Sequence, residues 1–170
     1  MISFRQYFEA VGFGENIPLG IDSINLVKKK AGDGINYEIK DGDVNLGWLA
    51  GFENEYGSIP GYGEKEKMFH LYNTGMMSAS ADSGFVRGEV DERVRDEKYK
   101  KKGIYRTAVQ KVANQYPLGL YVYNWEVSRM LRRSLAKMGT YIEIDDEDGS
   151  SGGWYKTLII KPIIKPDGVN

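Results

Sequence analysis

The sequence predicts one domain of the α+β or α/β class, because strand-like and helix-like periodicities alternate along its C-terminal half. From 86 to 94, valines and a glycine fall on alternate positions with charged residues on the other face, as in a half-buried strand. From 105 to 116, apolar residues recur at three and four positions, as on one face of an amphipathic helix. A chain of 170 residues is long enough for one ordinary core.

Four more elements follow this helix. After a proline, the aromatic and branched residues 118–124 predict a short buried strand. A second helix with one apolar stripe is expected from Glu126 to a glycine at 139. Residues 140–145 and 154–163 then predict two strands joined by a polar, glycine-rich loop. The expected order is strand, basic turn, helix, strand, helix and closing hairpin.

A basic turn lies between the first predicted strand and the first helix. Its sequence over 99–105 is Tyr-Lys-Lys-Lys-Gly-Ile-Tyr. The first N–H groups of a helix have no partner inside it and carry the positive end of its dipole, so an anion can satisfy them. Gly103 lets backbone amides approach a ligand closely. This pattern suits a pyrophosphate, and the alternative is an ordinary solvated turn.

Four segments between 35 and 163 resemble the GNAT superfamily of acyl-CoA-dependent N-acyltransferases. Residues 99–105 are similar to its pyrophosphate loop, with Lys100 in the Arg/Gln position and Gly103 at the first glycine. The strand ending at Asn124, with the helix that ends Lys-Met-Gly, is similar to its Asn-containing segment. Residues 35–51, which include an Asp-Gly turn, resemble its central hairpin, and 140–163 resemble its last two strands.

This resemblance implies a mixed, mostly antiparallel central sheet with flanking helices and a C-terminal hairpin. It also implies transfer of an acetyl group from acetyl-CoA to an amine, carried by a small molecule or a protein. The residues implied to bind the cofactor are Val94, Lys100, Lys101, Lys102, Gly103, Ile104, Tyr105, Asn124 and Arg129.

Three carboxylates on the predicted strand before the turn are candidates for the base that deprotonates the amine. Glu89 is preferred because it lies opposite the valine face, and Glu92 replaces it if a bulge shifts the register. Asp91 is the third candidate, and all three could instead pair with nearby arginines at the surface. Leu135 stands where the family often has a tyrosine that acts as general acid, so no acid is assigned.

Two other features depart from the family pattern. Tyr105 stands where a small residue is usual, which is tolerable if its side chain points into the core. The segment 52–83 is expected to be an insert that walls the acceptor site, because no pair of helices precedes the first hairpin. The only histidine, His70, lies on a predicted strand within this insert. We expect it to have a structural or substrate-side role, since a lone histidine makes no metal site.

The first twelve residues resemble the leaders of internal head proteins of T-even-like bacteriophages, with a cleavage expected after Glu9. The alternative is a short amphipathic helix that docks on the domain. Residues 12–20 contain glycines and a proline and are expected to form a linker. The expected organisation is therefore a leader or docking segment at 1–20 and an acyltransferase-like domain at 21–170.

Composition limits the function classes. The formal net charge is −1, which argues against a general binder of nucleic acid or membrane surfaces. Without cysteine there is no disulfide or thiolate metal site. Two alternatives to an enzyme of the host cytoplasm stay open: an inactive GNAT-like virion or host-inhibitor protein, and a small virion assembly protein in the phage capsid.

Overall fold

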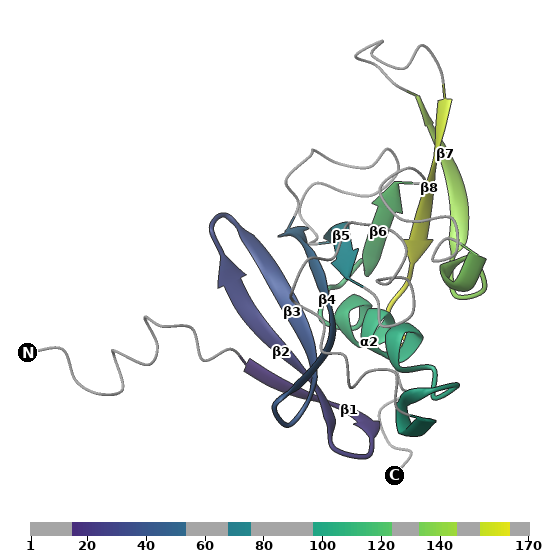
Figure 1. The fold of residues 1–170 in the computed structure, drawn as a ribbon. Helices are drawn as coiled ribbons and strands as arrows, with labels where there is room; N and C mark the ends of the chain where they lie inside the picture. Colours follow the sequence, from purple (N-terminus) through teal and green to yellow (C-terminus); the bar gives the residue numbers. More distant parts are fainter. Residues whose placement is uncertain (1–14, 54–67, 76–96, 124–132, 146–153, 164–170) are drawn as a thin grey trace, which may run out of the picture. The chain divides into compact units, whose positions relative to one another are not determined.

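The computed structural model describes residues 15–53, 68–75, 97–123, 133–145 and 154–163 (Figure 1). Eight strands form one sheet in the order β1-β2-β3-β4-β5-β6-β8-β7. The elements are β1 (Glu15–Ile21), β2 (Ile24–Ala31), β3 (Gly34–Asp41), β4 (Val44–Glu53), β5 (Phe69–Gly75), η2 (Glu97–Tyr99), α2 (Ile104–Ala113), β6 (Leu120–Tyr123), β7 (Thr140–Asp145) and β8 (Trp154–Ile160). The residues divide into two compact units, 1–50 with 74–104 and 51–73 with 105–170.

Two-residue turns connect the strands of the first unit. β1 pairs with β2 and β2 with β3, both antiparallel. Gly32 and Gly42 have φ values of 59° and 60°, which hairpin turns of this length need and glycine adopts without strain. The hairpin predicted over 35–51 is confirmed as β3 and β4, with its turn at Gly42 and Asp43. The core of this unit contains Leu26, Tyr37, Ile39, Leu46 and Leu49, all fully buried.

The linker predicted over 12–20 is wrong for residues 15–20, which belong to β1 and pair with β2. The glycine and proline that suggested a linker lie at an irregular part of this strand. The register shifts between Pro18 and Ile21, and Gly20 has a φ of 73°. Proline is tolerated on an edge strand because its missing N–H removes no essential ladder bond. Residues 1–14, with the predicted leader, lie outside the described part.

In the second unit, α2 confirms the predicted amphipathic helix. Ala108, Val109 and Val112 on its apolar stripe are buried. After the helix the chain turns through Tyr116, whose ring stacks on Phe69 of β5 with centroids 5.4 Å apart. The backbone N–H of Phe69 donates to the carbonyl of Gly119 at 2.9 Å. These contacts hold the turn after α2 against the start of β5.

One of the two strands beside β6 is β5, which lies inside the segment 52–83 that the sequence predicts to be an insert. β5 and β6 run parallel, so residues 69–75 belong to the sheet and are not only an added wall. Phe69, His70 and Leu71 are all buried, because this strand has neighbours on both sides and packing on both faces. The strand predicted around His70 is thus confirmed, whereas its place inside the sheet was not predicted. The strand predicted over 86–94 lies outside the described residues.

The C-terminal hairpin is confirmed, with β7 and β8 antiparallel and β8 also antiparallel to β6. Of the helix predicted from Glu126, the described part contains a helical turn at 133–135 that ends before Gly139. The sheet is therefore mixed and mostly antiparallel, as expected. Within the described ranges, no helix is long and apolar enough to cross a membrane.

Candidate functional site

Within the segment 99–105, residues Lys100 to Gly103 form the turn itself and lead directly into α2 at Ile104. From here on, the basic turn means these four residues. Lys101 and Gly103 have φ values of 57° and 65°, whereas Lys100 and Lys102 are outside the positive region. Alternating signs of φ turn successive backbone N–H groups toward one side, which is how nests bind anions. A lysine with positive φ is uncommon and costs free energy. A Cβ at Gly103 would meet nothing within 4 Å, so the space beside this backbone is open.

The N-terminus of α2 has no carboxylate of its own to cap it. Its first turn contains no acidic residue, and the residue before it is Gly103, which has no side chain. The orphan N–H groups and the positive end of the helix dipole therefore point at a turn that is itself cationic. This geometry is suited to an anion with more than one negative oxygen.

A carboxylate in the first unit anchors the segment that leads into the basic turn. Asp41, at the end of β3, accepts hydrogen bonds from the hydroxyls of Ser23 and Tyr99 and from the ammonium of Lys98. The Tyr99 hydroxyl lies 2.7 Å and the Lys98 Nζ lies 3.1 Å from Oδ2 of Asp41. Tyr99 is itself buried, at 2% exposure. We call these four side chains the Asp41 cluster.

The protonation states of the Asp41 cluster follow from these contacts. Hydrogen bonds from Ser23, Tyr99 and Lys98 lower the pKa of Asp41 to about 2. The Tyr99 hydroxyl and the Asp41 carboxylate raise the pKa of Lys98 to about 12. Burial, with the nearby Asp41 charge, raises the pKa of Tyr99. Near neutral pH, Asp41 is thus ionised, Lys98 is charged and Tyr99 keeps its proton.

We expect Asp41→Asn to lower the free energy of unfolding by about 1–2 kcal/mol at pH 7, because it removes a charged acceptor from a partly exposed cluster. The pKa of Asp41 is below its ordinary value of 3.8 in the folded protein, so this stabilisation is present above about pH 4. It is lost as the pH falls toward 2. Urea unfolding of both proteins from pH 7 to pH 2.5 checks this, and a difference that stays constant over this range contradicts it.

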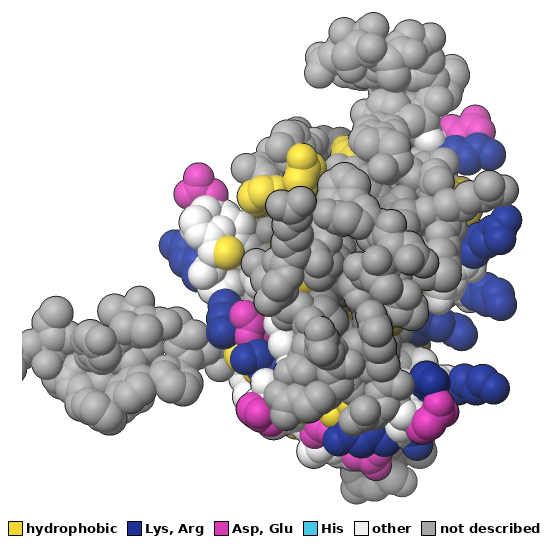
Figure 2. Space-filling view, in the orientation of Figure 1, with side chains coloured by type: hydrophobic (Ala, Val, Ile, Leu, Met, Phe, Trp, Pro, Cys, Tyr) yellow, Lys and Arg dark blue, Asp and Glu magenta, His cyan; other side chains and the backbone are white. Residues whose placement is uncertain are grey.

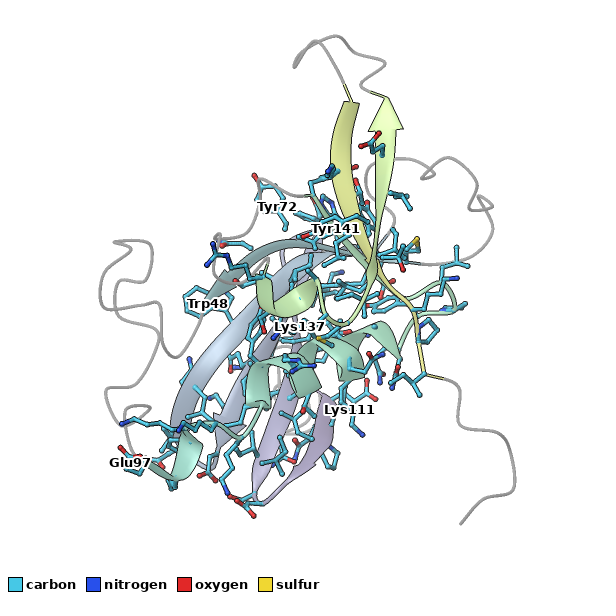
Figure 3. All side chains as sticks on the ribbon, turned by 90° about the vertical axis from the view of Figure 1, so that its right-hand side faces the viewer. Trp48, Tyr72, Glu97, Lys111, Lys137 and Tyr141 are labelled. Carbon is cyan, nitrogen blue, oxygen red and sulfur yellow. The ribbon has the colours of Figure 1, made fainter. Side chains whose placement is uncertain are left out.

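The residues predicted to bind the cofactor have different surroundings in the turn. Lys100 forms an ion pair with Glu97, one turn back in the chain (Glu97 is labelled in Figure 3). Lys101 and Lys102 are exposed. Ile104 and Tyr105 are buried, so their side chains belong to the core. Only their backbone N–H groups remain candidates for contact with a ligand. The remaining predicted site residues lie outside the described part: Glu89, Asp91, Glu92, Val94, Asn124 and Arg129.

His70 lies in an aromatic cluster in the second unit. Its ring stacks on Tyr121 at a centroid distance of 4.5 Å and an interplanar angle of 8°. The rings of Tyr123 and Tyr72 meet it edge-on at 5.0 and 6.1 Å. His70 and Tyr121 are opposite residues in the short parallel ladder between β5 and β6, which covers two positions. The stack therefore supplements a ladder with few hydrogen bonds, a structural role for this histidine.

Lysines and arginines line the right-hand side of Figure 2. Figure 3 faces that side and labels Lys111 on α2 and Lys137 after the helical turn. Among the described residues of the second unit, the exposed or half-buried cations are Arg106, Lys111, Arg133, Lys137, Lys156 and Lys161. The sequence allows two interpretations of the lysines and arginines around 129–137. They bind a ligand with several phosphates, or they form a solvated face of the helix.

Sequence reasoning missed Ser23 and Asp41 as parts of the site, and it included Tyr99 in the loop segment without giving it a role. The Asp-Gly dipeptide at 41 and 42 signalled only a hairpin turn. Tyr99 follows Asp41 by 58 residues, and no local pattern connects positions so far apart. Among the residues that the structure describes, no cluster of histidines and carboxylates could hold a metal ion. Comparison with known proteins finds no matching family model, no matching curated protein and no matching solved structure.

Proposed function

We propose that this protein is an N-acetyltransferase that takes its acetyl group from acetyl-CoA, and that the basic turn binds the cofactor's pyrophosphate. The observation that carries this proposal is the alternation of φ across Lys100 to Gly103, immediately before the N-terminus of α2, whose first turn has no acidic residue. Backbone N–H groups, a helix dipole and exposed lysines act together there on one small anion.

The order of elements around the turn supports the same proposal. Helix α2 follows the turn, β6 follows the helix, and the β7–β8 hairpin comes after both. This agrees with the part of the GNAT-like order that falls within the described residues, which do not include the strand before the turn. Tyr105 is buried, which is the condition under which a bulky residue fits at that position of the loop.

The proposed reaction needs a free amine, which attacks the thioester carbonyl and displaces the thiolate of CoA. An amine is mostly protonated at neutral pH, so a base must first remove a proton. Glu89, Glu92 and Asp91 remain the candidates for this base. The departing thiolate takes a proton from a group not yet assigned, since Leu135 is fully buried and has no acidic proton.

Isothermal titration of the full chain with acetyl-CoA, CoA and pantetheine tests this function. Pantetheine is the matched control, because it retains the thiol arm and lacks the pyrophosphate and the nucleotide. We expect saturable binding near one to one for acetyl-CoA and CoA, and none for pantetheine in the same concentration range. Equal affinities for all three compounds would show that the basic turn does not contribute to cofactor binding. No binding of any would contradict the proposal and favour an inactive virion or host-inhibitor protein.

A further inference from the structure

The lysines around the basic turn differ in what they contact. Lys98 is paired with Asp41, and Lys100 is paired with Glu97. Lys101 and Lys102 are exposed, and neither has an ion-pair or hydrogen-bond partner among the residues that the structure describes. Within the described ranges, two cations are therefore paired with carboxylates, and the other two have no such partner and can face an external anion.

Tyr99, the residue just before the basic turn, is held in place by its contacts. Tyr99 is buried, and its hydroxyl donates to Asp41. The ammonium of Lys98 lies 4.6 Å from the centre of the Tyr99 ring, and the backbone N–H of Lys100 donates to the carbonyl of Glu97 at 3.1 Å. Only Lys100 separates this anchored tyrosine from Lys101 and its positive φ.

We infer that Asp41 is a positioning residue for the anion site in the basic turn. Among the described residues, its carboxylate makes no hydrogen bond or ion pair with Lys100 to Gly103, and it acts through Tyr99 and Lys98. By holding these two side chains, it fixes where the turn begins, so that the backbone N–H groups and Lys101 and Lys102 are ordered before a ligand arrives. This inference rests on the proposed function, because it concerns the same anion site.

Two effects of replacing Asp41 have opposite signs. Asp41→Asn removes a negative charge close to the site and releases Lys98, and by charge alone this strengthens the binding of an anion. If Asp41 positions the turn, the same substitution weakens binding, because the turn must then be ordered when the ligand binds. The direction of the change in affinity separates positioning from a simple charge effect.

Affinity for CoA is measured for Asp41→Asn, Tyr99→Phe and Asp33→Asn. Tyr99→Phe removes the hydroxyl that reaches Asp41 without changing any charge. Asp33→Asn is the matched control, because it makes the same charge change at the exposed β2–β3 turn. We expect about a fivefold to tenfold weaker affinity for the first two variants, from ordering the turn during binding, and an unchanged or slightly tighter one for Asp33→Asn. Tighter or unchanged binding by Asp41→Asn would overturn the inference.

Amide hydrogen exchange of the same proteins without ligand gives the second readout. We expect faster exchange at the amides of Lys100 to Ile104 in Asp41→Asn and Tyr99→Phe, and no change there in Asp33→Asn. Unchanged exchange in both cluster variants would overturn the inference. If the wild-type protein bound no CoA, the proposed function would fail, and the exchange rates would still decide whether Asp41 positions the turn.

Discussion

Replacing Gly103 with glutamate is expected to weaken CoA binding at least about a hundredfold while the protein stays folded, because it places a negative charge and its bulk where the pyrophosphate is proposed to bind. The Cβ of a residue at 103 meets nothing within 4 Å, so the new side chain fits without displacing the core. It enters the open space beside the backbone N–H groups, where the anion is proposed to bind. Isothermal titration with CoA measures the loss.

Gly32→Glu is the control for this substitution. Gly32 has a φ of 59°, close to the 65° of Gly103, and its Cβ position is equally open. Both variants therefore add one negative charge and force a non-glycine residue into the left-handed region, at a cost of about 1–2 kcal/mol in the free energy of unfolding. Only Gly103→Glu should lose binding. Equal affinities for the two variants would show that the turn does not bind the cofactor.

Gly51→Ala is expected to lower the free energy of unfolding by about 3 kcal/mol or more. A Cβ at this position in β4 would lie 1.9 Å from the carbonyl oxygen of His70 and 2.9 Å from its carbonyl carbon. Both are backbone atoms of the neighbouring strand and cannot rotate away. The two strands would have to separate locally, which disturbs the position that carries the His70 ring. Urea unfolding followed by circular dichroism measures the change.

Gly42→Ala separates this clash from the other cost of replacing glycine. Gly42 has a positive φ and open space around its Cβ position, so alanine there introduces backbone strain without a collision. Its expected cost is about 1 kcal/mol. Similar losses of stability for Gly51→Ala and Gly42→Ala would contradict the close approach of β4 and β5.

Elements with a strong local pattern were predictable from the sequence. The helix α2 was visible because its apolar residues recur on one face, and β3 with β4 because an Asp-Gly turn lies between two apolar runs. The C-terminal hairpin was predictable for similar reasons. In each case the residues that set the structure are neighbours in the chain.

Features set by distant contacts were not predictable. The strand around His70 was predicted and is confirmed as β5, but its place in the sheet between β4 and β6 was not, because those neighbours come from other parts of the chain. Strand β1 has a proline and a bulge, which are typical of loops in a sequence and of edge strands in a sheet. Only the pairing with β2 shows that this segment is an edge strand and not a loop.

The candidate site also combines local features, which the sequence shows, with distant contacts, which it does not. The run of lysines before Gly103 indicated an anion site from the sequence, since charge and glycine are local features. Which lysines are neutralised depends on Asp41 and Glu97, and the contact of Lys98 with Asp41 joins positions 57 residues apart. The resemblance drew attention to Lys100, whereas the structure leaves Lys101 and Lys102 as the lysines of the turn without a partner in the described part.

The irregular strand β1 also bears on how copies of this protein behave together in concentrated solution. In the sheet, β1 has one neighbour, β2, and its other edge faces no strand of the sheet. A regular edge would offer a row of N–H and C=O groups to a strand of another molecule, and polymers can grow in this way. Pro18 has no N–H to offer, and the shift in register before Ile21 interrupts the row. The features that hid this strand in the sequence thus protect the protein against growth into fibres along this edge.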